Sequence, residues 1–362
     1  MSFALDNKHY SLEKSFKKEI NHFSKKSWFI VGSKLDFKKT NDFKTVTILN
    51  TPIVIFLDKN TKIKAFINVC QHRGAIIKKD EHGNGPLICP YHFWSYDDDG
   101  KIKNIPLKEK LFNQKELKHV ISSKKLKQWK LDFCGNFIFI SHPNNKTTLK
   151  NYLGTDYLKI KDISLAAQGR SSIQSWEWNA NWKICVENSL DEYHAKFAHP
   201  TTFSKLIKLD PVYSKSSNVY SMEMPIADTS VKKWSKFDKY FDKRQLKNNS
   251  YIHNHFFPMN SISSSYGVNF FIQTYMPITH NKTKVTSELY LTKNIDKKLS
   301  KNVLDALINS FLEFNTVVFN EDKLLCESVQ NGITSNQINK SLITSYEKRI
   351  SFFAKKLSKI YT

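Results

Sequence analysis

The sequence predicts an α+β fold, in which a small domain of β-strands is followed by a larger domain that mixes helices and strands. The chain has 362 residues, which is long enough for two domains with separate cores. Between residues 43 and 140, short apolar runs with a period of two alternate with turn residues, a pattern typical of strands. After residue 300 the apolar residues recur at helical spacing, which predicts long helices near the end of the chain.

The elements of the first half follow from these patterns. Residues 12–23 carry Phe16, Ile20 and Phe23 at helical spacing and predict an amphipathic helix. Clusters of polar residues with glycine predict turns at residues 82–85 and 97–100. The predicted strands cover residues 45–48, 52–56, 63–67, 87–88 and 135–140.

The second half begins after a predicted domain boundary at residues 144–157, where the periodicity is lost. A helix is expected from Asn181, a residue suited to capping it, and a long irregular stretch follows. Pro277 and Asn281 are expected in a connection between strands, and Gly332 is expected to end a long helix. The predicted strands are residues 173–178, 268–275 and 284–291, and the predicted helices are residues 302–330 and 337–360.

The charge and the cysteine content bear on the class of protein. The formal net charge of +23 suggests nucleic-acid binding, but the excess is nearly all lysine, spread from Lys8 to Lys359. Arginine, which suits phosphate and base contacts better, is scarce. The five cysteines lack dense disulfide spacing, and we find neither a signal peptide nor the run of roughly 18–20 apolar residues that spans a bilayer. We therefore expect a soluble cytoplasmic protein that binds no nucleic acid and no membrane, whose lysines lie on a solvated surface or face an acidic redox partner.

Two segments each offer one cysteine and one histidine as metal ligands. Cys70 and His72 stand in the first, Cys89 and His92 in the second, with sixteen residues between the pairs. Two thiolates on one iron and two imidazoles on the other can hold a [2Fe-2S] cluster of raised reduction potential. A structural zinc site is the alternative, although such sites usually use Cys-x-x-Cys or His-x-x-x-His pairs. A one-electron carrier of this kind predicts an electron acceptor elsewhere in the chain.

His194 and His199 are candidate ligands for that acceptor. Residues five apart lie about 140° apart around a regular helix, so the helix must end or bulge between them. Pro200 favours an end at His199, and Asp191 lies three residues before His194, on the same helical face. Two histidines and one carboxylate form the facial triad of non-haem Fe(II) oxygenases, which leaves positions for O2 and substrate. The alternative is a pair of structural histidines.

The third ligand is expected from the long C-terminal helix. Asp322 falls on an apolar stripe, where burying a carboxylate costs several kcal/mol unless a cation meets it. We expect Asp322 to be the carboxylate ligand, with Glu321 as the alternative. The stripe consists of Phe311, Phe314, Val318, Leu325 and Val329.

These segments resemble the α subunits of Rieske non-haem iron oxygenases, also called ring-hydroxylating oxygenases. Residues 70–75 and 89–96 resemble the Rieske segment of the family, residues 191–199 its Asp-x-x-His-x-x-x-x-His motif, and residues 320–330 its C-terminal ligand segment. Phe93 departs from the family, which usually has glycine there. Trp94 and Tyr96 are expected only to pack against the cluster loops.

The resemblance implies an architecture. Residues 1–40 would form an N-terminal helical segment that packs on the catalytic domain, residues 41–150 a small all-β Rieske domain, and residues 151–362 the catalytic domain. The catalytic domain would have the helix-grip (START-like) fold, in which an antiparallel sheet wraps a helix over the iron. The family also implies a ring-shaped homotrimer, possibly with a small β subunit.

The resemblance also implies roles and partners. Asp191 would link the iron to the Rieske cluster of a neighbouring subunit. Electrons would pass from NAD(P)H through a flavin reductase, a ferredoxin or both, and O2 would hydroxylate an aromatic or other small organic substrate by mono- or dioxygenation. The implied ligands are Cys70, His72, Cys89 and His92 for the [2Fe-2S] cluster, and His194, His199 and Asp322 for the mononuclear Fe(II).

The substrate and the reaction type stay open. The alternative reaction is oxidative demethylation of an O- or N-methyl group or oxidation of a quaternary amine, and a Rieske electron carrier without oxygenase activity is the alternative of another class. His253 and His255 alternate in a polar stretch and are expected at the surface or the rim of a pocket. Pocket residues are expected between residues 203 and 290, including Phe256, Phe257, Phe270, Phe271 and Tyr275.

Overall fold

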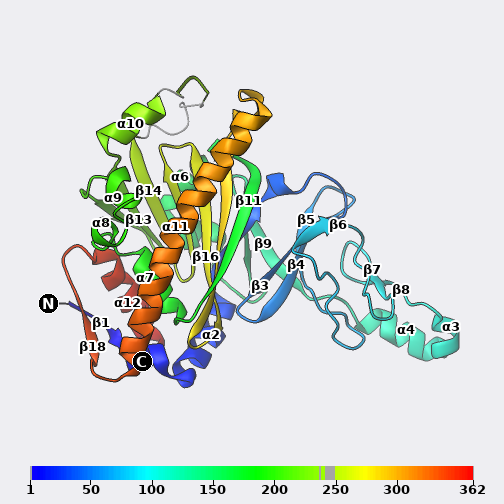
Figure 1. Cartoon of the computed structure of the whole chain (residues 1–362). Coiled ribbons are helices and arrows are strands. Elements are labelled where there is room, and N and C mark those ends of the chain that lie inside the picture. Colours follow the sequence, from blue (N-terminus) through cyan, green and yellow to red (C-terminus); the bar gives the residue numbers. More distant parts are fainter. Residues whose placement is uncertain (1, 236–237, 241–248, 362) are drawn as a thin grey trace.

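The computed structural model describes residues 2–235, 238–240 and 249–361. In this part of the chain, two seven-stranded sheets form the centres of two domains that lie side by side (Figure 1). The smaller domain lies on the right of this view and the larger on the left, where both ends of the chain are found. The predicted α+β class, with a small β domain and a larger domain around an antiparallel sheet, is confirmed.

The sheet of the small domain has the strand order β2-β10-β9-β5-β4-β3-β6, and its neighbouring strands are antiparallel. Alternation along β4 buries both faces of this sheet. Val54 and Phe56 contribute to a core shared with the Cys/His loops, whereas Ile53 and Ile55 contribute to a core shared with the larger domain. The strands are β2 (Trp28–Ser33), β3 (Asp42–Ile48), β4 (Thr51–Leu57), β5 (Ile63–Ile67), β6 (His82–Asn84), β9 (Gln128–Cys134) and β10 (Phe137–Ser141).

A small projection forms the far end of this domain (Figure 1). It consists of the two-stranded ribbon β7 (Ser95–Tyr96) and β8 (Ile102–Asn104) and the helices α3 (Lys108–Leu111) and α4 (Gln114–Ser123).

The small domain differs from the sequence prediction at two strands. β2 lies within residues 1–40, yet it pairs with β10 in the sheet. Every residue of β2 is buried, so its sequence lacks the alternation that predicts the other strands. Residues 82–84, predicted as a turn, form β6 and pair with β3. The strands predicted at 45–48, 52–56, 63–67 and 135–140 are confirmed, and the one at 87–88 is reduced to an isolated bridge at Ile88.

The sheet of the larger domain has the strand order β11-β17-β16-β15-β14-β13-β12 and is antiparallel throughout. Its strands are β11 (Ala167–Trp178), β12 (Val212–Lys215), β13 (Val219–Pro225), β14 (Ser250–Phe256), β15 (Asn260–Ser265), β16 (Asn269–Thr279) and β17 (Lys282–Thr292).

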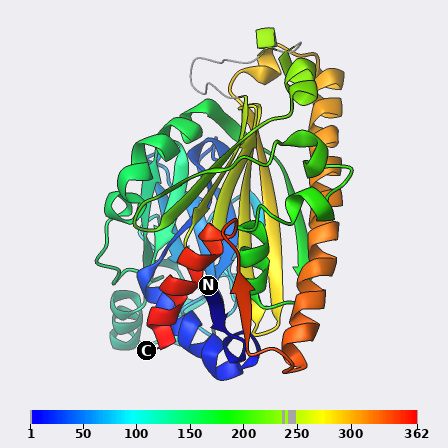
Figure 2. The ribbon, with the colours of Figure 1, turned by 90° about the vertical axis from the view of Figure 1, so that its left-hand side faces the viewer.

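Helices surround this second sheet. Figure 2 shows the long helix α11 running the length of the sheet along one edge, with α7 and α12 in front of the sheet. The α-helices are α1 (Lys8–Ser11), α2 (Glu13–Lys26), α5 (Leu149–Leu153), α6 (Tyr157–Ala166), α7 (Trp182–Ser189), α8 (Ala195–Ala198), α9 (Phe203–Leu206), α10 (Asp228–Ser235), α11 (Lys301–Thr334) and α12 (Lys348–Tyr361). The shorter elements are the 3-10 helices η1 (Lys34–Asp36), η2 (Gly154–Asp156), η3 (Asp238–Tyr240) and η4 (Ile295–Lys297), and the ribbon formed by β1 (Ser2–Asp6) and β18 (Lys340–Ile343).

The four strands between residues 212 and 265 replace the irregular stretch expected there. β15 has the sequence NSISSS, and serine and asparagine have little intrinsic preference for strands, so local pattern did not predict it. Pro277 lies inside β16 instead of in the connection. β15 pairs with β16 only as far as Thr274, so the proline interrupts no ladder on that side.

The predicted helices at residues 12–23 and 302–330 are confirmed by α2 and α11. Gly332 does not end α11, because the left-handed conformation that terminates such a helix comes later, at Asn336. The helix predicted over residues 337–360 begins only at Lys348. The preceding residues form β18, whose partner β1 lies at the other end of the chain and cannot be found from local pattern.

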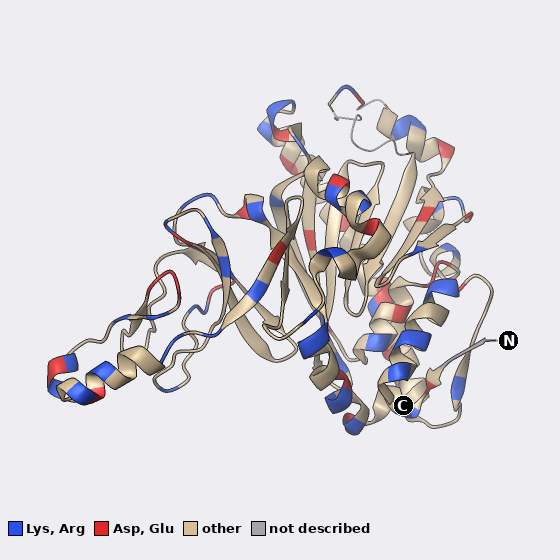
Figure 3. Cartoon of the chain, turned by 180° about the vertical axis from the view of Figure 1, so that it is seen from behind, with Lys and Arg blue, Asp and Glu red and all other residues tan. Residues whose placement is uncertain are grey.

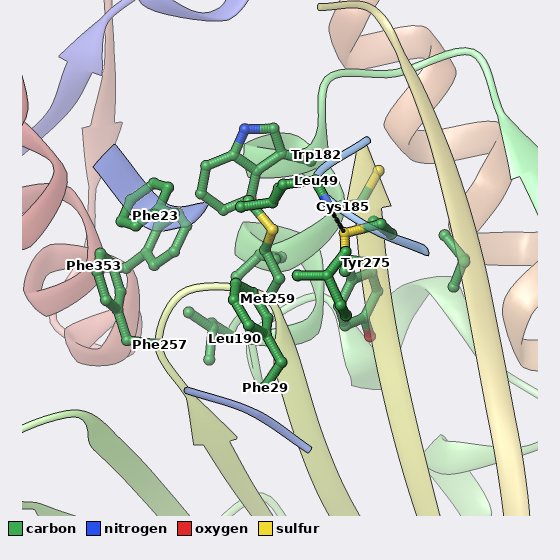
Figure 4. Packing of buried hydrophobic residues seen from close by; sticks show 14 of the residues in the cluster. Phe23, Phe29, Leu49, Trp182, Cys185, Leu190, Phe257, Met259, Tyr275 and Phe353 are labelled. Atoms are coloured by element: carbon green, nitrogen blue, oxygen red, sulfur yellow. Dashed lines mark hydrogen bonds between the residues drawn. The ribbon is translucent and has the colours of Figure 1, made fainter. Parts of the chain in front are cut away.

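A common core joins α7 to both ends of the chain (Figure 4). Trp182 at the start of α7 packs edge-on against Phe23 of α2 and Phe353 of α12, each with ring centroids 5.7 Å apart. Beside it, the buried Lys183 ammonium lies 2.8 Å from the buried carboxylate of Glu19. Breaking such a pair costs about 3–5 kcal/mol, so this ion pair stabilises the packing of α7 against α2.

The positive charge is spread over the molecule. Figure 3 shows Lys and Arg residues on helices and strands of both domains, in agreement with the dispersed lysines of the sequence. Among the described residues, no helix is both long and apolar enough to cross a membrane.

Candidate metal sites

The two Cys/His loops meet at the outer end of the small domain. Cys70 and Cys89 are buried, and their side chains are close enough to interact. His72 and His92 lie nearer the surface, with their Nδ1 atoms 3.2 Å apart. The loops thus bring together a pair of sulfurs and a pair of nitrogens.

The spacing of these four residues distinguishes a binuclear cluster from zinc. Two nitrogens bound about 2.1 Å from one metal at the tetrahedral angle lie about 3.4 Å apart, close to the His72–His92 separation. A single tetrahedral zinc would gather all four ligand atoms around one point. Among the described residues, the four do not form such a group, whose ligand atoms would all lie within 4.8 Å. The residues fit a cluster with one metal bound by thiolates and another by imidazoles.

Tyr96 and Trp94 do more than the packing expected of them. The Tyr96 hydroxyl accepts from the Gln71 N–H at 2.9 Å and lies 3.1 Å from Cys70 Sγ, so its own proton is free to be donated to the sulfur. Burial raises the pKa of Cys70, and the Tyr96 hydroxyl opposes that rise. Trp94 stacks on the His72 ring with centroids 4.6 Å apart and fixes its plane.

Phe93, which stands where the family usually has glycine, has a strained backbone conformation. Its φ of +59° lies in the left-handed region, which favours glycine. Its side chain is 64% exposed. The substitution therefore leaves a strained turn and an exposed ring beside His92.

The second set of residues lies where α7 ends. The chain leaves the helix after Ser189, and His194 and His199 flank the short helix α8 as its N-cap and C-cap residues. The break predicted from their spacing is confirmed. Asp191 lies in the turn between the helices rather than on a helical face, and its Oδ1 accepts from the Tyr193 N–H at 2.8 Å.

His194, His199 and Asp322 converge. The Nε2 atoms of the two histidines are 3.2 Å apart, and Asp322 Oδ1 lies 3.4 Å from His194 Nε2 and 3.1 Å from His199 Nε2. Ligand atoms about 2.1 Å from one metal and at right angles to each other lie about 3.0 Å apart, so the three atoms fit one triangular face of an octahedral ion. Asp322 Oδ1 is buried and lacks a well-formed hydrogen bond among the described residues, which is consistent with a role as metal ligand.

Two further carboxylates lie near the Nδ1 atoms of the two histidines, on the side of each ring away from the Nε2 atom. Glu321 Oε2 lies 2.6 Å from His199 Nδ1, on the opposite side of the ring from Asp322. Glu321, considered as the alternative ligand, is therefore placed to orient His199. Asp191 Oδ2 lies 3.3 Å from His194 Nδ1, within ion-pair distance, but His194 Nδ1 has no well-formed hydrogen bond among the described residues.

The charges of the site favour a cation. Burial would lower the pKa of His194, but the carboxylates of Asp191 and Asp322 outweigh it and raise that pKa to about 10. Burial would raise the pKa of Asp322, but the two histidines hold it at about 2. The carboxylate is thus anionic at neutral pH, and a divalent metal would displace protons from the imidazoles.

A cavity of about 110 Å³ lies beside these three residues. Aromatic and thioether side chains form much of its wall, and Asn, Ser and Gln side chains from β15, β16 and α11 add polar groups. Of the predicted pocket residues, Phe271 and Tyr275 line it, whereas Phe256, Phe257 and Phe270 do not line it and belong to hydrophobic cores. The apolar or aromatic lining residues are Ala195, Phe203, Ile207, Met222, Met224, Tyr251, Phe271, Tyr275, Phe311, Phe314, Val318 and Phe319.

The stripe predicted on α11 is partly wrong. Phe311 and Val318 are buried, but Leu325 and Val329 are exposed. The buried side instead turns toward Phe319 and Cys326, so Asp322 still lies between buried positions.

His253 and His255 are buried rather than at the surface, and His253 lines the cavity together with Arg349 of α12. Arg349 is missed by sequence reasoning, because it lies 150 residues after His199 and carries no motif. Its burial at 2% exposure is visible only in the fold.

Two family models match the chain. Residues 27–125 match the Rieske [2Fe-2S] domain, and residues 156–362 match the ring hydroxylating alpha subunit (catalytic domain).

Known proteins are similar to this chain over different lengths. The glycine betaine monooxygenase oxygenase subunit of Pseudomonas aeruginosa (strain UCBPP-PA14) is 29% identical over 236 residues, which cover 64% of this chain and 52% of that protein. The carnitine monooxygenase oxygenase subunit of Acinetobacter pittii (strain PHEA-2) is 26% identical over 340 residues, 90% of this chain and 84% of that protein. The aligned part thus spans only about half the length of the glycine betaine relative.

A solved structure shares the fold. The quaternary ammonium Rieske monooxygenase CntA in complex with L-carnitine superimposes with a TM-score of 0.81 at 19% identity, covering 99% of this chain and 96% of that one.

Proposed function

This chain belongs to the ring-hydroxylating alpha subunits of the Rieske non-haem iron oxygenases, and from that premise we propose that it is the oxygenase component of a multicomponent monooxygenase acting on a quaternary amine. The observation that carries the proposal is the convergence of His194, His199 and Asp322 beside an aromatic cavity. A chain that only carried electrons would need no such second site.

Each site has assigned residues in this proposal. Cys70, Cys89, His72 and His92 hold the [2Fe-2S] cluster. His194, His199 and Asp322 would hold Fe(II) beside the cavity that these residues line. When bound, the two metal centres supply electron delivery and O2 activation.

The protein itself positions and shields the reactants. Glu321 holds the plane of the His199 ring through Nδ1, the ring nitrogen that faces away from the metal position, and Asp191 lies 3.3 Å from the corresponding nitrogen of His194. The apolar wall excludes water, and Phe203 lines the cavity beside the site, with its ring centroid 5.7 Å from that of His199 and 5.1 Å from that of Tyr251.

The lining supports the quaternary amine, which is the alternative in the sequence interpretation, over the aromatic hydrocarbon. Aromatic faces bind quaternary ammonium groups through cation–π attraction. The relatives named above act, by their names, on glycine betaine and carnitine. In the proposed reaction one atom of O2 enters a C–H bond next to nitrogen and the other leaves as water, with two electrons and one proton from NAD(P)H and a second proton from solvent. The hydroxylated carbon then releases the amine and becomes a carbonyl group.

Asp191 and the partners complete the proposal. We assign Asp191 to electron transfer between a neighbouring subunit's cluster and this iron, in a homotrimer supplied by a flavin reductase or ferredoxin. The dispersed lysines would then face an acidic donor protein.

Oxygen uptake with a substrate panel tests the function. The protein, purified anaerobically with two cluster irons and one mononuclear iron per chain, is mixed with a Rieske-oxygenase reductase and NADH. Carnitine, glycine betaine, choline, benzoate and naphthalene are compared by ¹⁸O2 mass spectrometry. We expect substrate-dependent uptake and an amine plus an aldehyde from one quaternary amine. Oxygenation of an aromatic ring instead would restore the first interpretation, and iron-complete protein without uptake on any compound would contradict the oxygenase.

A further inference from the structure

The turn that follows α7 is held by an arginine from the other end of the chain. This turn starts at Ser189, the last residue of α7, and carries Asp191 and then His194. Arg349 Nη2 contacts the Glu192 carboxylate within the turn and donates to the Ser189 carbonyl oxygen at 3.4 Å. One guanidinium group therefore ties the start of the turn to its middle.

Both members of this ion pair are buried. Arg349 and Glu192 are each 2% exposed, and both line the cavity. Removing one member of a buried pair costs about 3–5 kcal/mol, because the other charge stays buried without its partner. The contact with Arg349 is therefore a strong constraint on the Glu192 side chain and, through it, on the turn.

Arg349 and Glu192 are themselves anchored on the large sheet. Arg349 Nη1 donates at 2.6 Å to Nδ1 of His253, a buried residue of β14. The Tyr213 hydroxyl on β12 lies 3.2 Å from the second carboxylate oxygen of Glu192. These two side chains thus link the turn to two strands of the sheet, which opposes its movement relative to the cavity wall.

The two proposed histidine ligands are supported differently. Glu321 Oε2 lies 2.6 Å from His199 Nδ1 and fixes the plane of that ring. His194 Nδ1 is buried and has no well-formed hydrogen bond among the described residues. Asp191, 3.3 Å away, belongs to the same turn and adds no independent support. The direction of the His194 Nε2 atom therefore depends on where the turn places the backbone of this residue.

We propose that Arg349 is a positioning residue for the iron site, which through Glu192 holds the turn so that His194 points its Nε2 atom at the metal position. Arg349 acts on the ligand through the backbone of the turn, and it carries no motif in the sequence. The inference rests on the proposed function for the identity of the metal. Loss of a group that orients a ligand weakens metal affinity by about 10–100-fold.

A second buried ion pair on α7 provides a matched control. Lys183 Nζ lies 2.8 Å from the Glu19 carboxylate, and both side chains are completely buried. This pair joins α7 to α2, and neither residue lines the cavity. Arg349→Met and Lys183→Met each remove a buried cation and leave a buried carboxylate that retains another hydrogen-bonding partner.

Titration with Fe(II) separates positioning from stability. The protein is stripped of mononuclear iron with its cluster retained, and Fe(II) is added anaerobically at a temperature at which every variant is folded. We expect Arg349→Met to bind Fe(II) about 10–100-fold more weakly than wild type. Lys183→Met should also lower the melting temperature, because a buried pair is broken, but it should keep the wild-type iron affinity.

A spectroscopic signature reports the arrangement of the ligands. The electron resonance of the nitric oxide complex of the mononuclear iron is recorded with the cluster oxidised and therefore silent. Arg349→Met should change this resonance, and Lys183→Met should not. Arg349→Lys keeps the charge but loses the forked guanidinium, so its iron affinity should fall between those of Arg349→Met and wild type.

Two results would overturn the positioning role. The first is folded Arg349→Met with wild-type iron affinity and resonance. The second is an equal loss of affinity in both methionine variants, because stability alone would then govern the iron. If Arg349→Met does not fold, Arg349→Lys decides, and wild-type affinity in that variant would contradict the proposal.

These outcomes are independent of turnover. Weak iron binding by Arg349→Met, in a protein whose wild type takes up no O2 with any substrate, would leave the positioning role and remove the oxygenase. Substrate-dependent uptake by the wild type, with unchanged iron affinity in every variant, would leave the oxygenase and remove the positioning role.

Discussion

The two candidate metal sites differ in what they expose. At the cluster loops the cysteines are buried, but His72 is exposed and Trp94 backs its ring. At the iron site His199 is 1% exposed, and the open side faces a cavity instead of bulk solvent. An electron can enter or leave the cluster site through a ligand at the surface, whereas activation of O2 requires water to be kept out. The exposed His72 therefore suits electron transfer, and the buried His199 suits oxygen chemistry.

Removal of a buried ligand should give the largest effect. His194→Ala should lose the mononuclear iron and lower turnover by more than about 100-fold, the upper cost of changing a supporting group. The visible absorption of the cluster should stay intact, because its ligands lie in the other domain. Iron analysis and oxygen uptake measure both. Loss of cluster absorption would mean that the two sites are assigned the wrong way round.

Asp191→Asn tests whether the two sites communicate through this residue. We expect both metals to be retained and turnover to fall by about 100-fold, because one misplaced link suffices for such a loss. Stopped-flow absorption should then show a reduced cluster that is slow to reoxidise with substrate and O2. Full turnover with complete iron would exclude the bridging role, and loss of iron would show that Asp191 only orients His194.

Glu321 should affect metal affinity more than chemistry. Glu321→Ala leaves His199 Nδ1 without its 2.6 Å partner and should weaken iron binding by about 10–100-fold. Glu321→Gln retains an acceptor and should lose much less. Iron titration of metal-depleted protein measures the change. Equal losses in the two variants would argue against the hydrogen bond as the cause.

Tyr96→Phe should alter the cluster without touching the iron site. The Tyr96 hydroxyl can stabilise the extra negative charge on Cys70 after reduction, so its removal should lower the reduction potential. A hydrogen bond of about 1.4 kcal/mol corresponds to about 60 mV for one electron. A redox titration followed by electron resonance reports the shift, and a potential within 10 mV of wild type would contradict the contact.

Phe93→Gly should have the smallest effect. Relief of the left-handed backbone is offset by the entropy of glycine in the unfolded chain, so we expect a gain in stability of up to about 1 kcal/mol. Thermal unfolding measures it, with cluster content as the control. A lower melting temperature would show that the exposed ring makes a stabilising contact.

The sequence reveals those features that are encoded locally. Both Cys/His loops, the break between His194 and His199 and the long helix α11 were predicted, because motif spacing and helical period are short-range signals. β12 to β15 were missed, and for β15 the reason is that its serines and asparagine are buried only by the tertiary structure. The pairing of β1 with β18 and the approach of Arg349 to His253 join residues 96 or more apart, which no local pattern shows.

The burial of Arg349 has a consequence for how the protein is made. The four proposed cluster ligands of the small domain, Cys70, His72, Cys89 and His92, all come before residue 93, so they are synthesised long before the end of the chain. The wall of the cavity needs α12, near the end of the chain, and α12 packs near α2, where Phe353 and Phe23 both contact Phe257. The cavity can therefore close only after nearly the whole polypeptide has been synthesised.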